Sequence, residues 1–464
     1  MKLSNKALLA LAISSITATA YAEPASQDFV PTTLASTNAQ SEANGFIEDF
    51  SLGGQTRNWY SNEQKYRGGT FSYQKHGQTV TDRRRENWVQ GTIVNATSGF
   101  TQGTVGVSTE VAVYNALVLD RSRRDIKGGS NRTLADSNGD AVDQWSKLGL
   151  ANVKFRVSNT TLTAGRQNFS SGIVDTIGNR ALPSSFQGVS IDSQEFSNLS
   201  FQGGIFDRVS PRSEQSLSKF RTEYGNGAET DKVYTAGLNY QPFKSLKTSF
   251  FGANVKDFWN QYYFGAAHQL GDSQELALTT GFNYYKTVDE GKKLMGEIDN
   301  DTFSLSLGLA HQAHSLTFSY QAVNGNEYFD YLHETNGIYL ANSLTSDFNG
   351  PNEKSFQVAY AINMAEYGVP GLKFNIYSAR GWGIDGTHYT GNGGRAKFAY
   401  DGIQSQDDEK HQEYGVGVGY AVQGGPLKET AIRATYVEHR GSANQSDGSI
   451  KELRVVTTIP FNIL

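Results

Sequence analysis

The chain contains no cysteine and only 9 prolines among its 464 residues. It also lacks any run of 18 or more apolar residues, so we expect no membrane-spanning helix. A chain of this length usually forms two or three globular domains and is too long for a small disulfide-held scaffold. However, a mean hydropathy of −0.48, 49 glycines and 12% aromatic residues are typical of many twisted strands and few helices.

The formal net charge is −5, with 41 basic against 46 acidic residues. This balance favours neither nucleic acid nor an anionic membrane surface as a partner. Any attraction for an anion must therefore come from basic residues that cluster locally.

The N-terminus has the pattern of a secretory signal peptide. Lys2 and Lys6 precede an apolar stretch, and Ala20-Tyr21-Ala22 supplies a small-x-small cleavage site. We expect residues 1–22 to be removed and the polar, aperiodic residues 23–44 to form a flexible leader. An exported chain without disulfides needs another source of stability, and a closed barrel that pairs every backbone group provides one.

From residue 45 onward, short segments alternate between apolar and polar side chains. The clearest is "FSLSLGLA" (303–310), with Phe303, Leu305, Leu307 and Leu309 on one side. A period of two predicts β-strands. Short turn-like links such as 158–161 and 271–274 mostly alternate with long polar stretches such as 120–144, 323–352 and 381–409. Short turns at one rim and long loops at the other are typical of a transmembrane β-barrel.

Counting hairpins gives about 18 strands of about 10 residues each, a size that encloses a water-filled channel. This count includes a short strand at 188–192, which has the weakest pattern. The sequence therefore predicts an all-β, antiparallel transmembrane barrel over residues 45–464, with short periplasmic turns and long extracellular loops.

Several long segments resemble the OprD-type outer-membrane porins. They include "GFIEDFSLGGQTRNWY" (45–60), "RALPSSFQGVSIDSQE" (180–195) and "ELRVVTTIPFNIL" (452–464). The resemblance extends from about Gly45 to Leu464. It implies a monomeric, 18-stranded channel in the outer membrane, with a third loop folded into the pore and a row of basic residues along it. Such channels pass small solutes that usually carry a carboxylate.

Five basic side chains lie on the polar side of predicted strands. They are Arg57, Lys154, Arg156, Arg433 and Arg454. Because Arg or Lys facing mid-bilayer lipid costs about 2–4 kcal/mol, we expect all five to face the channel. Barrel closure places Arg57, Arg433 and Arg454 on three adjacent strands. The resemblance supports these three as members of the basic row, whereas Lys154 and Arg156 rest mainly on alternation.

A row of guanidinium groups offers successive bidentate sites for a carboxylate, each weak enough to release it. The alternative is structural, with these residues paired to wall acids such as Asp49, Glu110 or Glu452. We expect the channel to take up small organic acids or amino acids. Between these solutes, we expect it to prefer carboxylates without a second charge over basic amino acids. Basic amino acids would require acids in the pore. The candidates for that role are Asp175, Glu327, Asp330, Glu334 and Asp347.

The stretch 167–187 is the expected inward loop. We expect the constriction to involve Arg166, which flanks the loop, together with Asp175, Arg180, Ser184 and Ser185. In this interpretation the arginine and the serine hydroxyls face the basic row. A surface loop with a solvated arginine is the alternative.

Other signals are weaker. Asp136, Asn138 and Asp140 have a calcium-like spacing without the distal glutamate, which favours a solvated turn over a cation site. The triplet Arg83 to Arg85 could guide anions, bind lipopolysaccharide phosphate or be a solvated charge run. There is no GxSxG, P-loop or HExxH motif, so we expect no catalytic centre, metal or cofactor. An outer-membrane enzyme and a purely structural barrel are the remote alternatives.

Overall fold

The computed structural model describes residues 39–120, 136, 138–225, 227–391 and 399–464. The predicted signal peptide and most of the predicted leader lie outside the described residues. The helical turns that are described are short. They include η1 (Gln40–Glu42), η3 (Met364–Tyr367) and η5 (Ile403–Ser405).

No helix in the described part of the chain is long and apolar enough to cross a membrane.

Eighteen strands form one sheet. The first nine along the chain are β1 (Ser51–Arg67), β4 (Arg84–Thr97), β5 (Gly106–Asp120), β6 (Gln144–Val157), β7 (Thr160–Gln167), β8 (Ser185–Phe196), β9 (Leu199–Ser210), β10 (Val233–Phe243) and β11 (Leu246–Val255). The remaining nine are β12 (Trp259–Asp272), β13 (Leu276–Asp289), β14 (Asp299–His311), β15 (His314–Asn324), β16 (Lys354–Asn363), β17 (Leu372–Ile384), β18 (Glu409–Ala421), β19 (Ala431–Gly441) and β20 (Ser449–Asn462).

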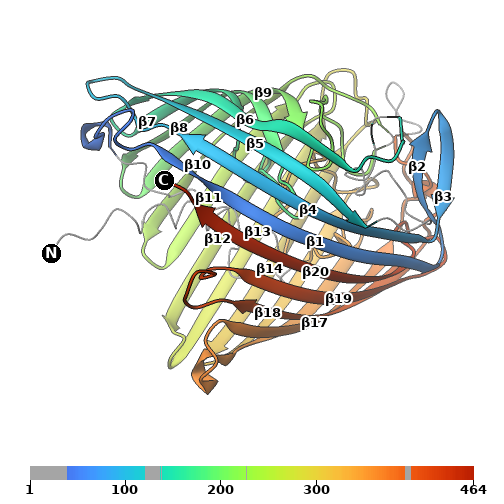
Figure 1. The fold of residues 1–464 in the computed structure, drawn as a ribbon. Coiled ribbons are helices and arrows are strands. Elements are labelled where there is room, and N and C mark those ends of the chain that lie inside the picture. Colours follow the sequence, from blue (N-terminus) through green and yellow to red (C-terminus); the bar gives the residue numbers. More distant parts are fainter. Residues whose placement is uncertain (1–38, 121–135, 137, 226, 392–398) are drawn as a thin grey trace.

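The sheet closes on itself because β1 pairs antiparallel with both β4 and β20. At the closure, Arg57 lies opposite Gly91 on one side and Thr458 on the other. Closure leaves no unpaired edge, as a strand-built membrane protein requires. The predicted antiparallel barrel of about 18 strands is confirmed. A separate hairpin of β2 (Phe71–Lys75) and β3 (Gln78–Asp82) projects from one rim (Figure 1).

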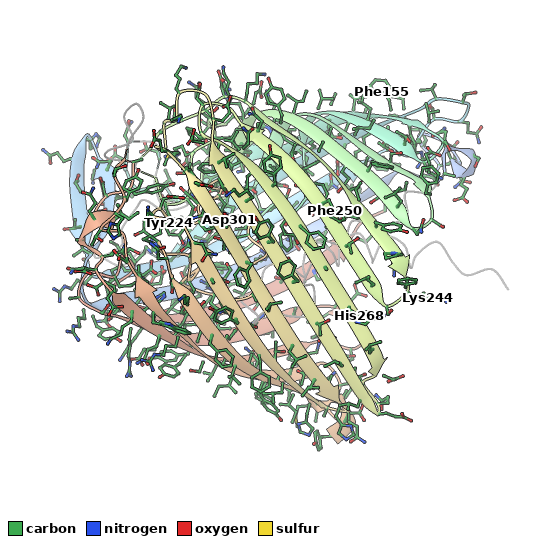
Figure 2. The ribbon with its side chains drawn as sticks, turned by 180° about the vertical axis from the view of Figure 1, so that it is seen from behind. Phe155, Tyr224, Lys244, Phe250, His268 and Asp301 are labelled. Atoms are coloured by element: carbon green, nitrogen blue, oxygen red, sulfur yellow. The ribbon has the colours of Figure 1, made fainter. Side chains whose placement is uncertain are left out.

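Alternation along the strands separates the two faces of the wall. On β14, Leu305 is 50% exposed, whereas its neighbour Ser304 is 1% exposed. Phe155 and Phe250 are also exposed on the outer face of the barrel. Figure 2 shows both residues in a view from the side opposite to that of Figure 1. The apolar side chains therefore point outward and the polar ones inward, the reverse of a water-soluble protein and the arrangement that lipid demands.

The links between strands differ at the two rims. One rim, here the short-turn rim, has tight links such as 158–159, 197–198 and 244–245. The other, the long-loop rim, has stretches such as 325–353 and 385–408, although the link 256–258 is short.

The predicted short strand at 188–192 is part of the longer β8. Its pattern is weak in the sequence because Gly188, Ser190 and Asp192 alternate with only two large apolar residues, Val189 and Ile191. Pairing with β7 and β9 on both sides nevertheless satisfies its backbone.

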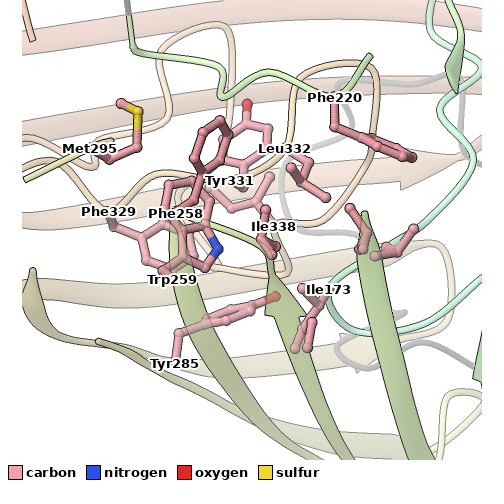
Figure 3. Close-up of a cluster of buried hydrophobic side chains, with 14 of the residues drawn as sticks. Ile173, Phe220, Phe258, Trp259, Tyr285, Met295, Phe329, Tyr331, Leu332 and Ile338 are labelled. Atoms are coloured by element: carbon pink, nitrogen blue, oxygen red, sulfur yellow. The ribbon is translucent and has the colours of Figure 1, made fainter. Parts of the chain in front are cut away.

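Several links of the long-loop rim pack against the inside of the wall. We call three of them loop 3 (168–184), loop 4 (211–232) and loop 7 (325–353). Ile173 of loop 3, Phe220 of loop 4 and Leu332 of loop 7 share one buried cluster with Trp259 and Tyr285 of the wall (Figure 3). Full burial of such a side chain contributes about 1.5–3 kcal/mol, so the cluster holds the loops in the barrel.

Candidate functional site

Arg57 on β1 connects the wall to loop 3. Its side chain is 2% exposed, and its Nη1 donates hydrogen bonds to the carbonyls of Gly178 (2.6 Å) and Arg180 (2.8 Å). Its Nε donates to Thr458 Oγ1 at 3.2 Å. The alternation of β1 turns this guanidinium inward, where the backbone carbonyls of loop 3 accept its hydrogen bonds. Arg57 therefore supports loop 3 from the wall of the barrel.

Arg454 on β20 also faces inward, beside Trp59 of β1. Its Nε and Nη2 lie 2.7 and 2.6 Å from Glu452 Oε1, and its guanidinium lies 4.9 Å from the Trp59 ring. Glu452 and Arg454 are two residues apart on one strand, which places both on the inner face. Arg433 on β19 is 9% exposed and lies opposite Val456 of β20.

Arg180 of loop 3 approaches the same tryptophan, with its guanidinium 5.6 Å from the Trp59 ring. Burial, together with the nearby cations Arg212 and Arg454, lowers the pKa of Arg180 to about 9. Among the residues that the structure describes, no carboxylate lies within ion-pair distance of Arg180. Loop 3, loop 4 and β20 thus bring Arg180, Arg212 and Arg454 into one inner site, which we call the arginine cluster.

Arg212 is held by an acid of loop 7. Both its backbone N–H and its Nε donate to Glu334 Oε2 at 2.8 Å, and its Nη1 donates to Asn179 Oδ1 of loop 3. Burial alone would raise the pKa of Glu334. The nearby Arg212 and His333 outweigh burial and lower this pKa to about 2. One arginine therefore connects loops 3, 4 and 7.

Two of the predicted basic residues lie apart from this cluster. Lys154 Nζ is 3.0 Å from Glu110 Oε2, which matches the bracing alternative for that residue. Arg156 donates from Nε to Gln40 Oε1 (3.0 Å), and its guanidinium lies 3.8 Å from the Phe100 ring. Both residues are near the end of β6 that leads into the short link 158–159.

Arg166 belongs to β7, where it lies opposite Ala151, and it donates to the carbonyl of Leu148. It does not join the arginine cluster. Asp175 of loop 3 is buried, and its Oδ2 accepts from Tyr339 (2.8 Å) and Asn336 (3.2 Å). Burial outweighs these hydrogen bonds and raises the pKa of Asp175 to about 6.

The two serines predicted at the constriction are fully buried. Ser184 Oγ accepts from the backbone N–H of Ile177 at 3.1 Å, and Ser185 Oγ donates to the carbonyl of Gly149 at 2.7 Å. Their hydroxyls thus brace loop 3 and the start of β8. This differs from the expectation that they face the basic row, because the loop uses them for its own packing.

Loop 7 contributes acids to the interior. Asp347 Oδ2 accepts from Tyr224 (2.6 Å) and Tyr331 (2.8 Å), and its Oδ1 accepts from Ser343 (2.6 Å). Asp330 Oδ1 accepts from the backbone N–H of Tyr331 at 2.8 Å. Burial raises the pKa of Asp347 above its ordinary value and that of Asp330 to about 7.

The family described as "outer membrane porin, OprD family" matches residues 44–463. The chain belongs to the OprD family of outer-membrane porins.

The similarity covers nearly the whole OprD-family chain. Porin D of Pseudomonas aeruginosa is 34% identical over 435 residues, which cover 92% of this chain and 94% of that relative. The porin-like protein GalP of Pseudomonas putida is 27% identical, covering 93% and 96%. Among solved structures, Pseudomonas aeruginosa OccD3 (OpdP) has 43% identity, a TM-score of 0.81 and coverage of 92% and 95%. Pseudomonas aeruginosa OprD has 33% identity, a TM-score of 0.77 and coverage of 92% and 99%.

Membership in the OprD family determines the class of activity. The protein is a substrate-specific channel and an integral protein of the bacterial outer membrane. It is not an enzyme, since its relatives and its fold are those of porins.

Two weaker sequence signals have ordinary local contacts in this porin. Asp136 Oδ1 accepts the backbone N–H groups of Asn138 and Asp140, both at 2.9 Å, which is the arrangement of a turn. In the basic triplet, Arg84 pairs with Glu86 at 2.8 Å and Arg85 with Glu63 at 2.5 Å.

The sequence analysis did not identify Arg212. This residue lies in an aperiodic polar stretch, where alternation gives no direction for a side chain. Only the packing of loop 4 against loop 7 places it beside Glu334, 122 residues away.

Proposed function

We propose that this porin passively admits small carboxylate-bearing solutes, and that the arginine cluster guides them past loop 3. The observation that carries the proposal is the proximity of Arg180, Arg212 and Arg454. Three like charges in a partly desolvated site repel one another, and a passing carboxylate relieves that repulsion while accepting charge-assisted hydrogen bonds.

Two of these arginines already have acidic partners, which suits a channel. Arg454 is paired with Glu452 and Arg212 with Glu334. A solute carboxylate meets partly neutralised groups there, so binding stays weak enough for release. Arg180 has no such pair among the described residues and is the residue we expect to contribute most to attraction.

Uptake of basic amino acids is the second candidate, favoured by the acids of loops 3 and 7. Those acids hold less negative charge than their number suggests. The raised pKa values of Asp175 (about 6) and Asp330 (about 7), caused by burial, leave both partly protonated near neutral pH. A cationic side chain therefore gains less from them, and we place carboxylates without a second charge first.

Uptake into proteoliposomes tests the proposal. We expect benzoate to enter faster than arginine, and Arg180→Gln and Arg454→Gln to slow benzoate entry about tenfold, since each removes charge-assisted hydrogen bonds. Arg440→Gln is the matched control, because the Arg440 side chain is 53% exposed and pairs with Glu438. Unchanged benzoate entry in both cluster variants would rule out this role. Faster arginine entry in the wild type would favour the second candidate.

We also propose that the channel acts as a monomer and contacts lipopolysaccharide at the long-loop rim. One chain closes its own barrel, and Arg83 is exposed beside the start of β4. Native mass spectrometry tests both points. A trimer mass would refute the monomer, and equal lipopolysaccharide retention by wild type and Arg83→Gln would refute the contact.

A further inference from the structure

Two histidines and an aspartate converge on the inner side of β18 and β19, away from the arginine cluster. His411 lies on β18, His439 on β19, and Asp447 in the link 442–448, which we call loop 9. One potential ligand atom from each lies within 4.8 Å of the others. The closest contact joins His411 Nδ1 to His439 Nε2 at 2.7 Å.

The remaining ring nitrogens show which atoms carry protons. His439 Nδ1 is 2.8 Å from the carbonyl of Gly448, which can only accept, so this nitrogen is protonated. His411 Nε2 is 2.5 Å from Glu353 Oε1, so it donates to that carboxylate. In the neutral forms of both rings, the lone pairs of His411 Nδ1 and His439 Nε2 then point at each other. At 2.7 Å the contact holds one shared proton. A metal ion would replace this proton with a small outward shift of the rings, since two nitrogens each about 2.0–2.1 Å from Zn²⁺ lie about 3.3 Å apart in tetrahedral geometry.

We propose that these two nitrogens and a carboxylate oxygen of Asp447 bind a divalent transition-metal ion, of which Zn²⁺ is the representative. Imidazole nitrogen with one carboxylate oxygen suits Zn²⁺, whereas Ca²⁺ and Mg²⁺ prefer oxygen ligands throughout. The outer contacts also match a metal site. Each histidine donates its other N–H to a carboxylate or a backbone carbonyl, which fixes the ring orientation.

Asp447 is oriented as a ligand would need to be. Its Oδ2 accepts from Ser346 Oγ at 2.7 Å and from Gln445 Nε2 at 3.1 Å. Both histidines are buried, and the Phe348 ring lies 4.2 Å from the His411 ring, which keeps the site largely dry. Asp447 is only half-buried and its neighbour Ser446 is exposed, so an ion has a path through loop 9.

The surrounding charges favour a cation. Glu353 contacts His411, and Glu413 lies on the same strand, where it accepts from Tyr377 at 2.6 Å. Lys65 of β1 is the nearby positive charge that acts on His439 and Asp447. The carboxylates of Asp447 and Glu353 would offset the charge of a divalent ion. Because Ser346 and Glu353 belong to loop 7, the ion would also fix loops 7 and 9 to the wall.

Zinc binding to the purified full-length porin, stripped with EDTA in detergent, tests this inference. We expect one Zn²⁺ per chain by isothermal titration and elemental analysis, no comparable binding of Mg²⁺, and a rise in melting temperature with zinc. Asp447→Asn and His439→Gln should weaken binding at least tenfold. Asp447→Asn retains an oxygen for Ser346 and Gln445, so its fold should be preserved.

His314→Gln is the control, because His314 is an exposed histidine that contacts Tyr360 and Tyr367 on the surface. It should bind zinc as the wild type does. Two results would overturn the proposal: a wild-type protein that binds no zinc, which would leave a shared proton between the histidines, or equal affinity in wild type, Asp447→Asn and His439→Gln.

Discussion

Glu334 of loop 7 accepts two hydrogen bonds from Arg212 of loop 4, one from its backbone N–H and one from its Nε, both at 2.8 Å. The pair is buried, so neither group has water as an alternative partner. Charges of this kind are expensive to separate, because the partner left behind stays buried and unpaired. This contact therefore acts together with the apolar cluster in keeping loops 4 and 7 docked inside the barrel.

Glu334→Gln should weaken the docking of these loops. We expect local destabilisation of about 3–5 kcal/mol, since the charge of Arg212 loses its partner. Hydrogen exchange over residues 211–232 and 325–353 measures this as faster opening. Lys292→Gln removes an exposed pair with Asp257 and should cost less than about 1 kcal/mol. Equal protection in Glu334→Gln and wild type would contradict the role of the pair.

Arg57→Gln should loosen loop 3, because the variant cannot keep both bonds to the carbonyls of Gly178 and Arg180. Hydrogen bonds from a charged donor contribute about 1.5–3 kcal/mol each. We expect a larger and noisier single-channel conductance in planar bilayers. Arg440→Gln, on the outer face, should leave the conductance unchanged. A quiet channel of wild-type conductance in Arg57→Gln would mean that loop 3 is held by its apolar contacts alone.

Ion selectivity should depend on pH through the buried acids. Burial raises the pKa of Asp175 to about 6 and that of Asp330 to about 7. Both therefore gain negative charge as the pH rises from about 5 to 8, and cation preference should rise over the same window. Reversal potentials in a potassium chloride gradient measure this change. The double variant Asp175→Asn with Asp330→Asn should flatten the dependence, and an unaltered profile would assign it to other groups.

The outer face can be tested by charge. Leu305→Arg places a cation in the middle of β14 and should reduce the free energy of folding into lipid vesicles by about 2–4 kcal/mol. Leu276→Arg, at the end of β13 near the short-turn rim, should cost only about 0–1 kcal/mol. Urea titration in vesicles measures both. Equal costs at the two positions would contradict the expectation that Leu305 lies at mid-bilayer and Leu276 near the membrane surface.

The predicted signal peptide gives a further test. Cleavage after Ala22 should leave a mature chain that begins at Glu23. Intact mass of the protein purified from outer membranes measures the N-terminus directly. A mass that retains residues 1–22 would contradict the prediction.

Alternation by itself determined the wall of this porin. Leu305 outside and Ser304 inside follow from period two, because neighbouring side chains on a strand must point to opposite faces. The cost of charge in lipid then requires Arg57 and Arg454 to face the inside of the barrel. Closure adds that their strands are neighbours. Alternation and the cost of charge are local rules, and each can be applied within about ten residues.

Only the tertiary structure decided what those charges contact. Arg57 reaches the carbonyl of Gly178, 121 residues away, and Lys154 of β6 pairs with Glu110 of the neighbouring strand β5. Ser184 accepts a hydrogen bond from Ile177 within loop 3, and Arg212 pairs with Glu334. Loops 3, 4 and 7 have no repeating pattern that assigns a direction to a side chain. Their positions depend on burying apolar residues such as Phe220 and Leu332 against distant strands, which is a property of the whole packed interior.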